Sequence, residues 1–344
     1  MVRNHSPDSA PNSSGRGLNG IGFVLKKKKN CAAGVARLRD NLSNMHGLAI
    51  SGALLFVGLA CAQQSAANRG LKVYISVDME GVAGTVTPDQ LLPSGFEYER
   101  FRGFMTQEAL AAVSAAKEAG ASQIVVSDSH GNGENMLIEK FPNDVRVVRS
   151  WPRHLGMMAG IDRTFNAVIF IGYHASTHNM RGVRAHTFSS ASLTRVALNG
   201  TPVSEGAFNA AIAGDLGVPV VMISGDDAAI ADVRSLVGPI EGAETKRYLG
   251  FHSADTLTPQ AACDLIRQSA AKALHRIGDF KPYVVRHPVT LDVTFKNYLP
   301  SEVLSYLRVI ERTDSHTIRF RAQDMQEAAD FMEFIEWYRI GLEP

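Results

Sequence analysis

Cysteine is scarce in this chain of 344 residues, which contains only Cys31, Cys61 and Cys263. We expect the first two to be removed with a targeting segment, so the mature chain would keep Cys263 alone. A single cysteine excludes an intrachain disulfide, even in an oxidising compartment. Cys263 stands among small and apolar residues at helical spacing. We therefore interpret it as a small core residue and not as a nucleophile.

A strong excess of one charge is also missing, since 35 Lys and Arg face 34 Asp and Glu. The distribution is uneven, because residues 1–62 hold eight basic side chains, four of them at Lys26–Lys29, and two acids. The rest of the chain therefore has 27 basic and 32 acidic residues. A mildly acidic body argues against nucleic acid as the partner.

The apolar stretch Leu48–Leu59 is too short to cross a bilayer as a helix, which needs about 20 residues. Ala60-Cys61-Ala62 follows it. The length of the stretch and the small residues after it match the core and the cleavage site of a secretory signal. We expect cleavage after Ala62 and an exported protein, periplasmic or extracellular, with no stable membrane span in the mature chain.

Two alternatives for this targeting segment stay open. A basic region of more than forty residues before the apolar stretch is unusual, so Met45 is an alternative start to Met1. Cys61 is compatible with a lipoprotein, but Gly58 stands where that signal expects a large aliphatic residue. We interpret residues 1–62 as a disordered basic segment with a signal peptide, and residues 63–70 as a linker.

From Leu71 onward, strand-like and helix-like stretches alternate, which predicts an α/β fold with a mostly parallel sheet flanked by helices. The expected strands are 73–77, 124–126, 145–148, 167–173 and 218–223; the expected helices are 98–119 and 205–216; a hairpin is expected about Asn199-Gly200. After about residue 250 the pattern changes to a helix over 259–277, an alternating strand over 289–295 and a helix over 322–338. We predict a metal-binding catalytic domain over 71–250 and a smaller α+β subdomain over 251–344.

Polar side chains collect at the expected carboxyl ends of these strands, which is where open α/β sheets bind ligands. The first strand ends in Ser76-Val77-Asp78-Met79-Glu80-Gly81. The period of two lets Asp78 and Glu80 point in one direction. Later strand ends and a helix start add His130, His174 and Glu205. Carboxylates and imidazoles are zinc ligands, and five of them exceed the need of one catalytic ion. We therefore expect two metal ions that share the short Asp78 carboxylate.

Two of these residues, taken singly, also have a plainer explanation, whereas a histidine that ends an apolar run, such as His174, is harder to explain without a site. His130 could cap a loop, and Glu205 could complement a helix dipole. Other polar positions have plainer interpretations still: a solvated loop for His178, a helix N-cap for Asp226-Asp227, and a role in orienting His130 or shaping its turn for Asp128. The ligand set would also accept Mn²⁺ or Co²⁺ in place of zinc.

From about Leu71 to its end, the chain resembles peptidase family M55, the D-aminopeptidase family. The resemblance rests on the segments Ser76–Gly81, Ser127–His130, Gly172–Ala175, Ala185-His186 and Val203–Gly206 with Asn209. It implies two zinc ions per subunit, with Asp78 as the bridge. Glu80 and His130 would complete one site, His174 and Glu205 the other, and His186 would be the catalytic histidine. It also implies a homo-oligomeric ring, decameric in the type enzyme.

The expected reaction is hydrolysis of short peptides with an N-terminal D-residue, of the D-Ala type, by a hydroxide held between the two ions. Zinc makes such a hydroxide available by lowering the pKa of bound water to about 7. His186 would stabilise the oxyanion or carry a proton to the leaving amine. A dinuclear metal amidase or L-aminopeptidase is the alternative on the same scaffold. An exported peptide-binding protein is the alternative from another class, but such a protein has no use for five converging ligands.

Overall fold

The computed structural model describes residues 70–338. The expected basic segment, the signal peptide and the alternatives at Met45 and Cys61 lie outside these residues. Across residues 70–338, no helix combines the length and the apolar character needed to cross a membrane.

The larger sheet has seven strands in the order β3-β2-β1-β4-β7-β8-β9. Their bounds are β1 Leu71–Val77, β2 Ala121–Asp128, β3 Val145–Val148, β4 Ala167–Tyr173, β7 Val220–Asp226, β8 Glu241–Gly250 and β9 Ser253–Thr256. All neighbouring pairs are parallel except β8 and β9. The central strand β4 is buried along its whole length, as an apolar run covered on both faces must be. The prediction of an α/β fold with a mostly parallel sheet is confirmed.

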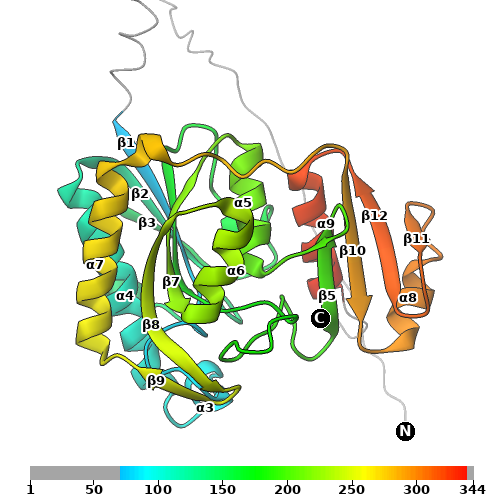
Figure 1. Cartoon of the computed structure of the whole chain (residues 1–344), viewed down its shortest axis with the longest axis horizontal. Helices are drawn as coiled ribbons and strands as arrows, with labels where there is room; N and C mark the ends of the chain where they lie inside the picture. The colour runs from blue at the N-terminus through cyan, green and yellow to red at the C-terminus, as the bar shows by residue number, and fades with distance from the viewer. Residues whose placement is uncertain (1–69, 339–344) are drawn as a thin grey trace, which may run out of the picture. The chain divides into compact units, whose positions relative to one another are not determined.

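Helices cover both faces of this sheet, with α4 (Tyr98–Glu118) and α7 (Pro259–His275) on one and α5 (Glu205–Asp215) and α6 (Asp227–Val237) on the other (Figure 1). The alternation of β1 divides its side chains between the two layers. Val73, Ile75 and Val77 join the core beneath α4 and α7, whereas Tyr74 joins the core on the opposite face. The remaining short helices are α3 (Pro88–Leu91), η1 (Ile138–Lys140), η2 (Gly156–Met158) and η3 (Ile277–Asp279).

A second, antiparallel sheet has the strand order β11-β12-β10-β5-β6. Its strands are β5 Leu193–Leu198, β6 Thr201–Pro202, β10 Val289–Phe295, β11 Ile310–Arg312 and β12 Thr317–Ala322. Two helices accompany it, α8 (Tyr298–Leu304) and α9 (Met325–Trp337), and α9 packs against it beside α5 (Figure 1). The hairpin predicted at Asn199-Gly200 joins β5 to β6, and both turn residues have positive φ.

The boundary predicted at residue 250 does not coincide with the division between the two sheets. β5 precedes it in sequence but pairs with β10, with Leu198 opposite Leu291. Conversely, α7 follows it but packs against α4 and buries Ile266 in the core of the first sheet. The helix expected over 322–338 begins at Met325, because the side chain of Asp324 caps it and residues 317–322 form β12.

The order of the larger sheet reverses between β1 and β4, since the chain continues from β1 to β2 and β3 on one side and from β4 to β7 on the other. At such a point the connections that follow the two strands run to opposite faces of the sheet, and ligands bind in the crevice between them. Asp78 directly follows β1, and His174 directly follows β4. The fold therefore places both residues at the switch point of the sheet.

Candidate metal centre

Six side chains converge beyond the carboxyl ends of three neighbouring strands. They are Asp78 and Glu80 after β1, His130 after β2, His174 after β4, His186 in the loop before β5, and Glu205 at the start of α5. All six lie deep in the protein, and the most exposed side chain, that of His186, is 12% accessible. The five expected metal ligands and the expected catalytic histidine thus occupy one place.

The six side chains form two groups of possible ligands, and within each group the ligand atoms lie within 4.8 Å of one another. One group is Asp78, Glu80 and His130; the other is His174, His186 and Glu205. Asp78 faces both, because its Oδ1 is 3.3 Å from Nδ1 of His130 and its Oδ2 is 3.4 Å from Nε2 of His174. His130 is also 2.8 Å from Glu80, and His174 is 3.3 Å from Glu205. One carboxylate therefore presents a different oxygen to each half of the cluster.

The turn that carries Asp78 and Glu80 is held against the end of β4 by two close backbone contacts. The amide of Asp78 donates to the carbonyl of Ile171 at 2.8 Å, and that of Gly81 donates to Gly172 at 2.6 Å. A Cβ atom at Gly81 would lie 2.1 Å from the Tyr173 carbonyl oxygen. A Cβ at Gly172, which has φ of +69°, would lie 2.3 Å from the carbonyl oxygen of Asp78. Only glycine permits this approach, so both glycines bring the first ligands next to His174.

Each of the three imidazoles has one nitrogen held by a backbone carbonyl. Nε2 of His130 is 3.0 Å from the Leu91 oxygen, Nδ1 of His174 is 3.0 Å from the Ala175 oxygen, and Nδ1 of His186 is 2.8 Å from the Arg184 oxygen. A carbonyl accepts, so the nitrogen beside it carries the proton. The other nitrogen of each ring points toward the carboxylates, and in the neutral ring it offers a lone pair that a metal ion can accept. This arrangement is the one that orients histidine ligands in metal sites.

Two atoms at the centre of the cluster, Oδ2 of Asp78 and Nε2 of His174, are buried and make no hydrogen bond within residues 70–338, although they lie 3.4 Å apart. An unpaired buried polar atom is costly. A divalent cation bound here would satisfy both atoms and would offset two of the three negative charges of the buried carboxylates. The nitrogen and oxygen donors present are those that zinc accepts, so the residues fit the metal.

The pKa shifts of the ligand groups reflect this crowding of charge. Burial, reinforced by the nearby Glu80, raises the pKa of Asp78 to about 8. Burial disfavours the charged form of His174, but Glu205 and Asp78 outweigh it and raise its pKa to about 10. In contrast, burial and the neighbouring His174 lower the pKa of His186. His186 is thus a neutral imidazole at neutral pH, suited to accept a proton.

The loop around His186 has a strained backbone that fixes two of the site side chains. Arg184 and Phe188 both have left-handed φ, of 56° and 60°. The carbonyl of Arg184 orients His186, and the amide of Phe188 donates to Oε1 of Glu205 at 2.6 Å. Such conformations persist where the surrounding structure imposes them, and they cluster at functional sites.

The predicted roles of three other polar residues are confirmed. Asp128 accepts hydrogen bonds from the amides of Asn135 and Met136, and so shapes the turn after His130. Asp226 caps α6 by accepting from the amide of Ala229. His178 is exposed on its loop.

Sequence reasoning missed Lys246, a fully buried lysine on β8. Its ammonium donates to the carbonyl oxygens of Glu80, Val82 at 3.1 Å and Thr85 at 2.6 Å. The three donors of the side chain therefore hold the turn that contains Glu80. The sequence gives no sign of this burial, because Lys246 stands directly before the charged Arg247.

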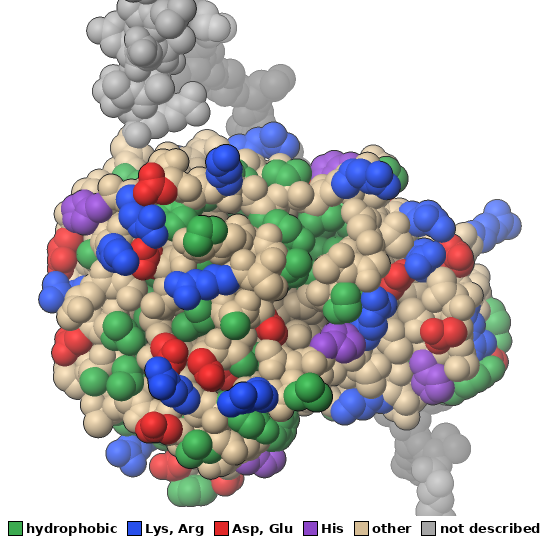
Figure 2. Space-filling model, in the orientation of Figure 1, with side chains coloured by type: hydrophobic (Ala, Val, Ile, Leu, Met, Phe, Trp, Pro, Cys, Tyr) green, Lys and Arg blue, Asp and Glu red, His purple; other side chains and the backbone are tan. Residues whose placement is uncertain are grey.

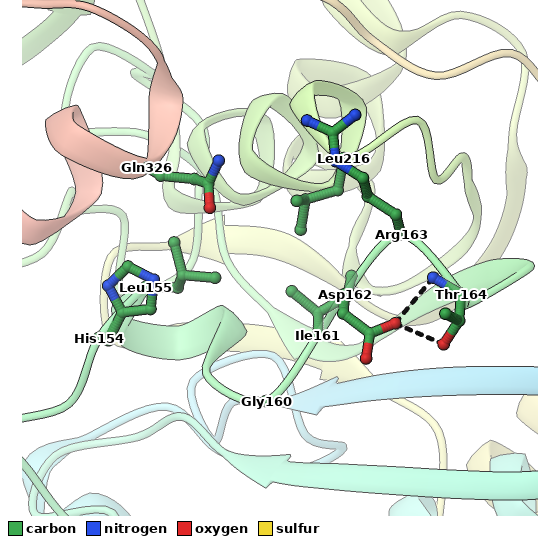
Figure 3. Close-up of a pocket in the computed structure, with 9 residues that line it drawn as sticks. All are labelled: His154, Leu155, Gly160, Ile161, Asp162, Arg163, Thr164, Leu216 and Gln326. Carbon is green, nitrogen blue, oxygen red and sulfur yellow. Dashed lines mark hydrogen bonds between the residues drawn. The ribbon is translucent and has the colours of Figure 1, made fainter. Parts of the chain in front are cut away.

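A cavity of about 350 Å³ opens beside His186. Figure 3 shows a larger cavity of about 560 Å³, which is lined by residues such as His154, Arg163 and Gln326. On its wall, the backbone amide of Thr164 donates a hydrogen bond to Oδ1 of Asp162. None of the six clustered side chains lines this larger cavity. The smaller cavity is therefore the one associated with the cluster.

Three comparisons relate the chain to known proteins. Residues 71–334 match the family model Peptidase M55, described as D-aminopeptidase. The chain is similar to a D-aminopeptidase of Bacillus subtilis strain 168, with 32% identity over 264 residues, covering 76% of this chain and 95% of the relative. It is also similar in structure to the Zn-dependent D-aminopeptidase DppA from Bacillus subtilis, described as a self-compartmentalizing protease. That match has a TM-score of 0.74 and 30% identity and covers 79% of this chain and 100% of the other.

Proposed function

The chain belongs to the M55 family of D-aminopeptidases and is a metallo-aminopeptidase; from this premise we propose that it uses two zinc ions to hydrolyse short peptides with an N-terminal D-residue of the D-Ala type. The observation that carries the dinuclear part is the position of Asp78, which turns one oxygen to His130 and the other to His174. A carboxylate that faces two ligand groups in this way is suited to bridge two ions. The D-specificity is supported by the names of the two relatives.

Glu80 and His130 would hold one ion with Asp78, and His174 and Glu205 would hold the other. Zinc in this place supplies Lewis-acid polarisation of the peptide carbonyl and a nucleophile at neutral pH. The backbone carbonyls beside His130 and His174 keep the ligand nitrogens aimed inward.

His186 has the properties of a proton carrier for this reaction. It borders the cavity, its proton on Nδ1 is held by Arg184, and its Nε2 lies 3.7 Å from Glu205. Because its pKa is lowered, Nε2 is unprotonated at neutral pH and can take up a proton. It can then give that proton to the amine that leaves.

Cysteine chemistry has no support as an alternative mechanism. Cys263 lies half-buried on α7, and burial raises the pKa of its thiol to about 11. A thiol with this pKa stays protonated at neutral pH and is a poor nucleophile.

Export and assembly also belong to the proposal. The apolar stretch Leu48–Leu59 and the small residues 60–62 support export, and N-terminal sequencing of the mature protein should find Gln63 first. The self-compartmentalizing relative supports a homo-oligomer, which light scattering coupled to gel filtration would measure.

Metal content and hydrolysis of matched peptides test the enzyme function. Protein purified without chelator should hold two zinc ions per chain, and it should hydrolyse D-Ala-D-Ala and D-Ala-Gly faster than their L counterparts. Less than one ion per chain with no hydrolysis after zinc addition would favour the peptide-binding protein. Equal rates on L-peptides would favour the L-aminopeptidase or amidase alternative.

A further inference from the structure

The cavity beside His186 is bordered by two cationic side chains from different parts of the fold. Its lining consists of Thr177, Arg184, Ala185, His186, Ser190, Leu193, Phe251 and Lys296. Arg184 comes from the loop that carries His186, whereas Lys296 directly follows β10 of the second sheet. Figure 2 shows basic and histidine side chains near each other on the face where the two sheets meet. At about 350 Å³, the cavity is at the small end of ligand pockets.

Neither cation has an acidic partner. No carboxylate of residues 70–338 lies within 4.0 Å of Arg184 or Lys296, although many other basic side chains of the protein form such pairs. The three clustered carboxylates of the metal centre face the histidines instead. The cavity therefore places two positive charges without acidic partners beside the imidazole of His186.

Both cations also keep donors available. Lys296 gives one hydrogen bond, to the Ser190 carbonyl, and an ammonium has three donors. Arg184 has Nη1 3.0 Å from Nε2 of His252 and rests against the Phe251 ring, while its buried Nε has no partner within the described part of the chain. A guanidinium with such donors is suited to a planar anion such as a carboxylate.

The position of His186 decides which end of a peptide enters this cavity. If His186 passes a proton to the leaving amine, the residue that leaves must lie on the side of the cluster where His186 is exposed. That side is the cavity with Arg184 and Lys296. In a dipeptide, the leaving residue carries the free α-carboxylate.

We propose that Arg184 and Lys296 form a subsite for the C-terminal α-carboxylate of the substrate, so that the enzyme selects dipeptides with a free carboxyl end. This inference rests on the proposed function, since it assigns the leaving-group side of the same site. Each added residue would move the carboxylate by about 3.5 Å, away from the two cations. Dipeptides should therefore be better substrates than tripeptides of the same residues.

A pair of peptides that differ only in the carboxylate tests the subsite by kinetics. The wild-type enzyme should hydrolyse D-Ala-D-Ala with kcat/KM about tenfold or more above that of D-Ala-D-Ala amide, because the amide cannot accept charge-assisted hydrogen bonds. In Lys296→Met the KM for the acid should rise by about tenfold, with little change for the amide, and Arg184→Met should act in the same direction. The matched control is Lys281→Met, at an exposed position that does not line the cavity, and it should change neither value.

Calorimetry on the zinc-loaded protein gives a second measurement that does not depend on turnover. N-acetyl-D-Ala-D-Ala lacks the free amine that an aminopeptidase requires, so it should bind without being cleaved. It should bind about tenfold more tightly than its amide, and Lys296→Met should abolish the difference. Inorganic phosphate that binds without displacing the peptide would identify an anion site unrelated to the substrate, and would overturn the proposal.

The outcomes separate the subsite from the enzyme function. Equal binding and equal kcat/KM for acid and amide in the wild type would reject the subsite while leaving the peptidase intact. A loss of both substrates to the same extent in Lys296→Met would also reject it, because a structural role affects both alike. If the protein hydrolyses neither peptide but still binds N-acetyl-D-Ala-D-Ala more tightly than its amide in calorimetry, the proposed function alone is rejected.

Discussion

The imidazole rings of His174 and His186 stack in parallel, with centroids 3.9 Å apart and planes 7° apart. Their inward nitrogens have different surroundings. Nε2 of His174 lies within 3.4 Å of both Asp78 and Glu205, whereas Nε2 of His186 is 3.7 Å from Glu205 and 4.0 Å from Glu80. The shorter distances favour His174 as the ligand, and the cavity beside His186 favours contact with substrate.

The variant His186→Ala separates these two roles. It should retain both zinc ions and lose turnover by about 10²–10⁴-fold, because the ring acts on protons and not on the metal. Elemental analysis of the purified variant and its kcat on D-Ala-D-Ala measure both quantities. The control is His178→Ala, an exposed histidine on the same loop, which should match the wild type. Loss of zinc in His186→Ala would show that the residue is a ligand.

The position of Asp78 between two ligand groups predicts unequal metal loss in two carboxylate variants. Asp78→Ala should lose both ions, because both sites use it, whereas Glu205→Ala should keep the ion held by Glu80 and His130. Zinc per chain after dialysis against metal-free buffer measures this, with the exposed Asp264→Ala as control. The same stoichiometry in both variants would contradict a bridge.

Lys246 should stabilise the metal centre through the backbone of the turn at residues 80–85. Lys246→Met leaves three buried carbonyl oxygens without their donor, so it should lower the free energy of unfolding by about 2–5 kcal/mol. It should also weaken zinc binding, because Glu80 lies in the loosened turn. Urea unfolding and zinc titration measure the two effects.

The matched control for that experiment is Lys272→Met. Lys272 forms a surface ion pair with Glu241 at 3.1 Å and is 67% exposed, so its loss should cost less than about 1 kcal/mol. Similar effects of the two substitutions would mean that the contacts of Lys246 do not support the turn.

The sequence reveals those elements whose pattern is set locally. β4 is an apolar run because it is buried on both faces, and α4 and α5 begin at the residues predicted for them. β8 was not predicted, because the buried Lys246 interrupts the alternation of apolar and polar residues. The hydrogen-bond acceptors of Lys246 are backbone carbonyls more than 160 residues earlier in the chain. The membership of β5 in the second sheet depends likewise on its pairing with β10, about a hundred residues later.

The site also has a part that the sequence predicts and a part that it does not. Its residues could be found by reading the strand ends in order, because the parallel sheet brings those ends together. The nitrogen that each histidine turns inward could not be found. Which ring nitrogen faces the site is set by a nearby backbone carbonyl in His174 and His186. In His130 it is set by the carbonyl of Leu91, which lies 39 residues earlier in the chain.

Glu108 should make the stability of the protein depend on pH. This residue of α4 is 1% exposed; its Oε1 accepts from the amide of Ala83 at 2.9 Å, and its Oε2 has no partner within residues 70–338. Burial raises its pKa to about 7, although Ala83 and Lys246 oppose the shift. A carboxyl group whose pKa is raised by folding is more stable in its neutral form. Its favourable contribution is therefore complete below about pH 4.5 and is lost as the pH rises through about 7.

Glu108→Gln cannot ionise, so it should escape this loss. Relative to the wild type, the variant should gain up to about 3 kcal/mol of stability between pH 5 and pH 8, with most of the gain between pH 5 and pH 7. Urea unfolding of both proteins across this range measures the difference in their free energies of unfolding. The pH dependence that comes from the metal centre is common to both proteins and cancels in this difference. Glu139→Gln, at an exposed position, should show a flat difference. A flat difference for Glu108→Gln as well would mean that Glu108 is already ionised in the folded protein at pH 5, with Lys246 as its counter-charge.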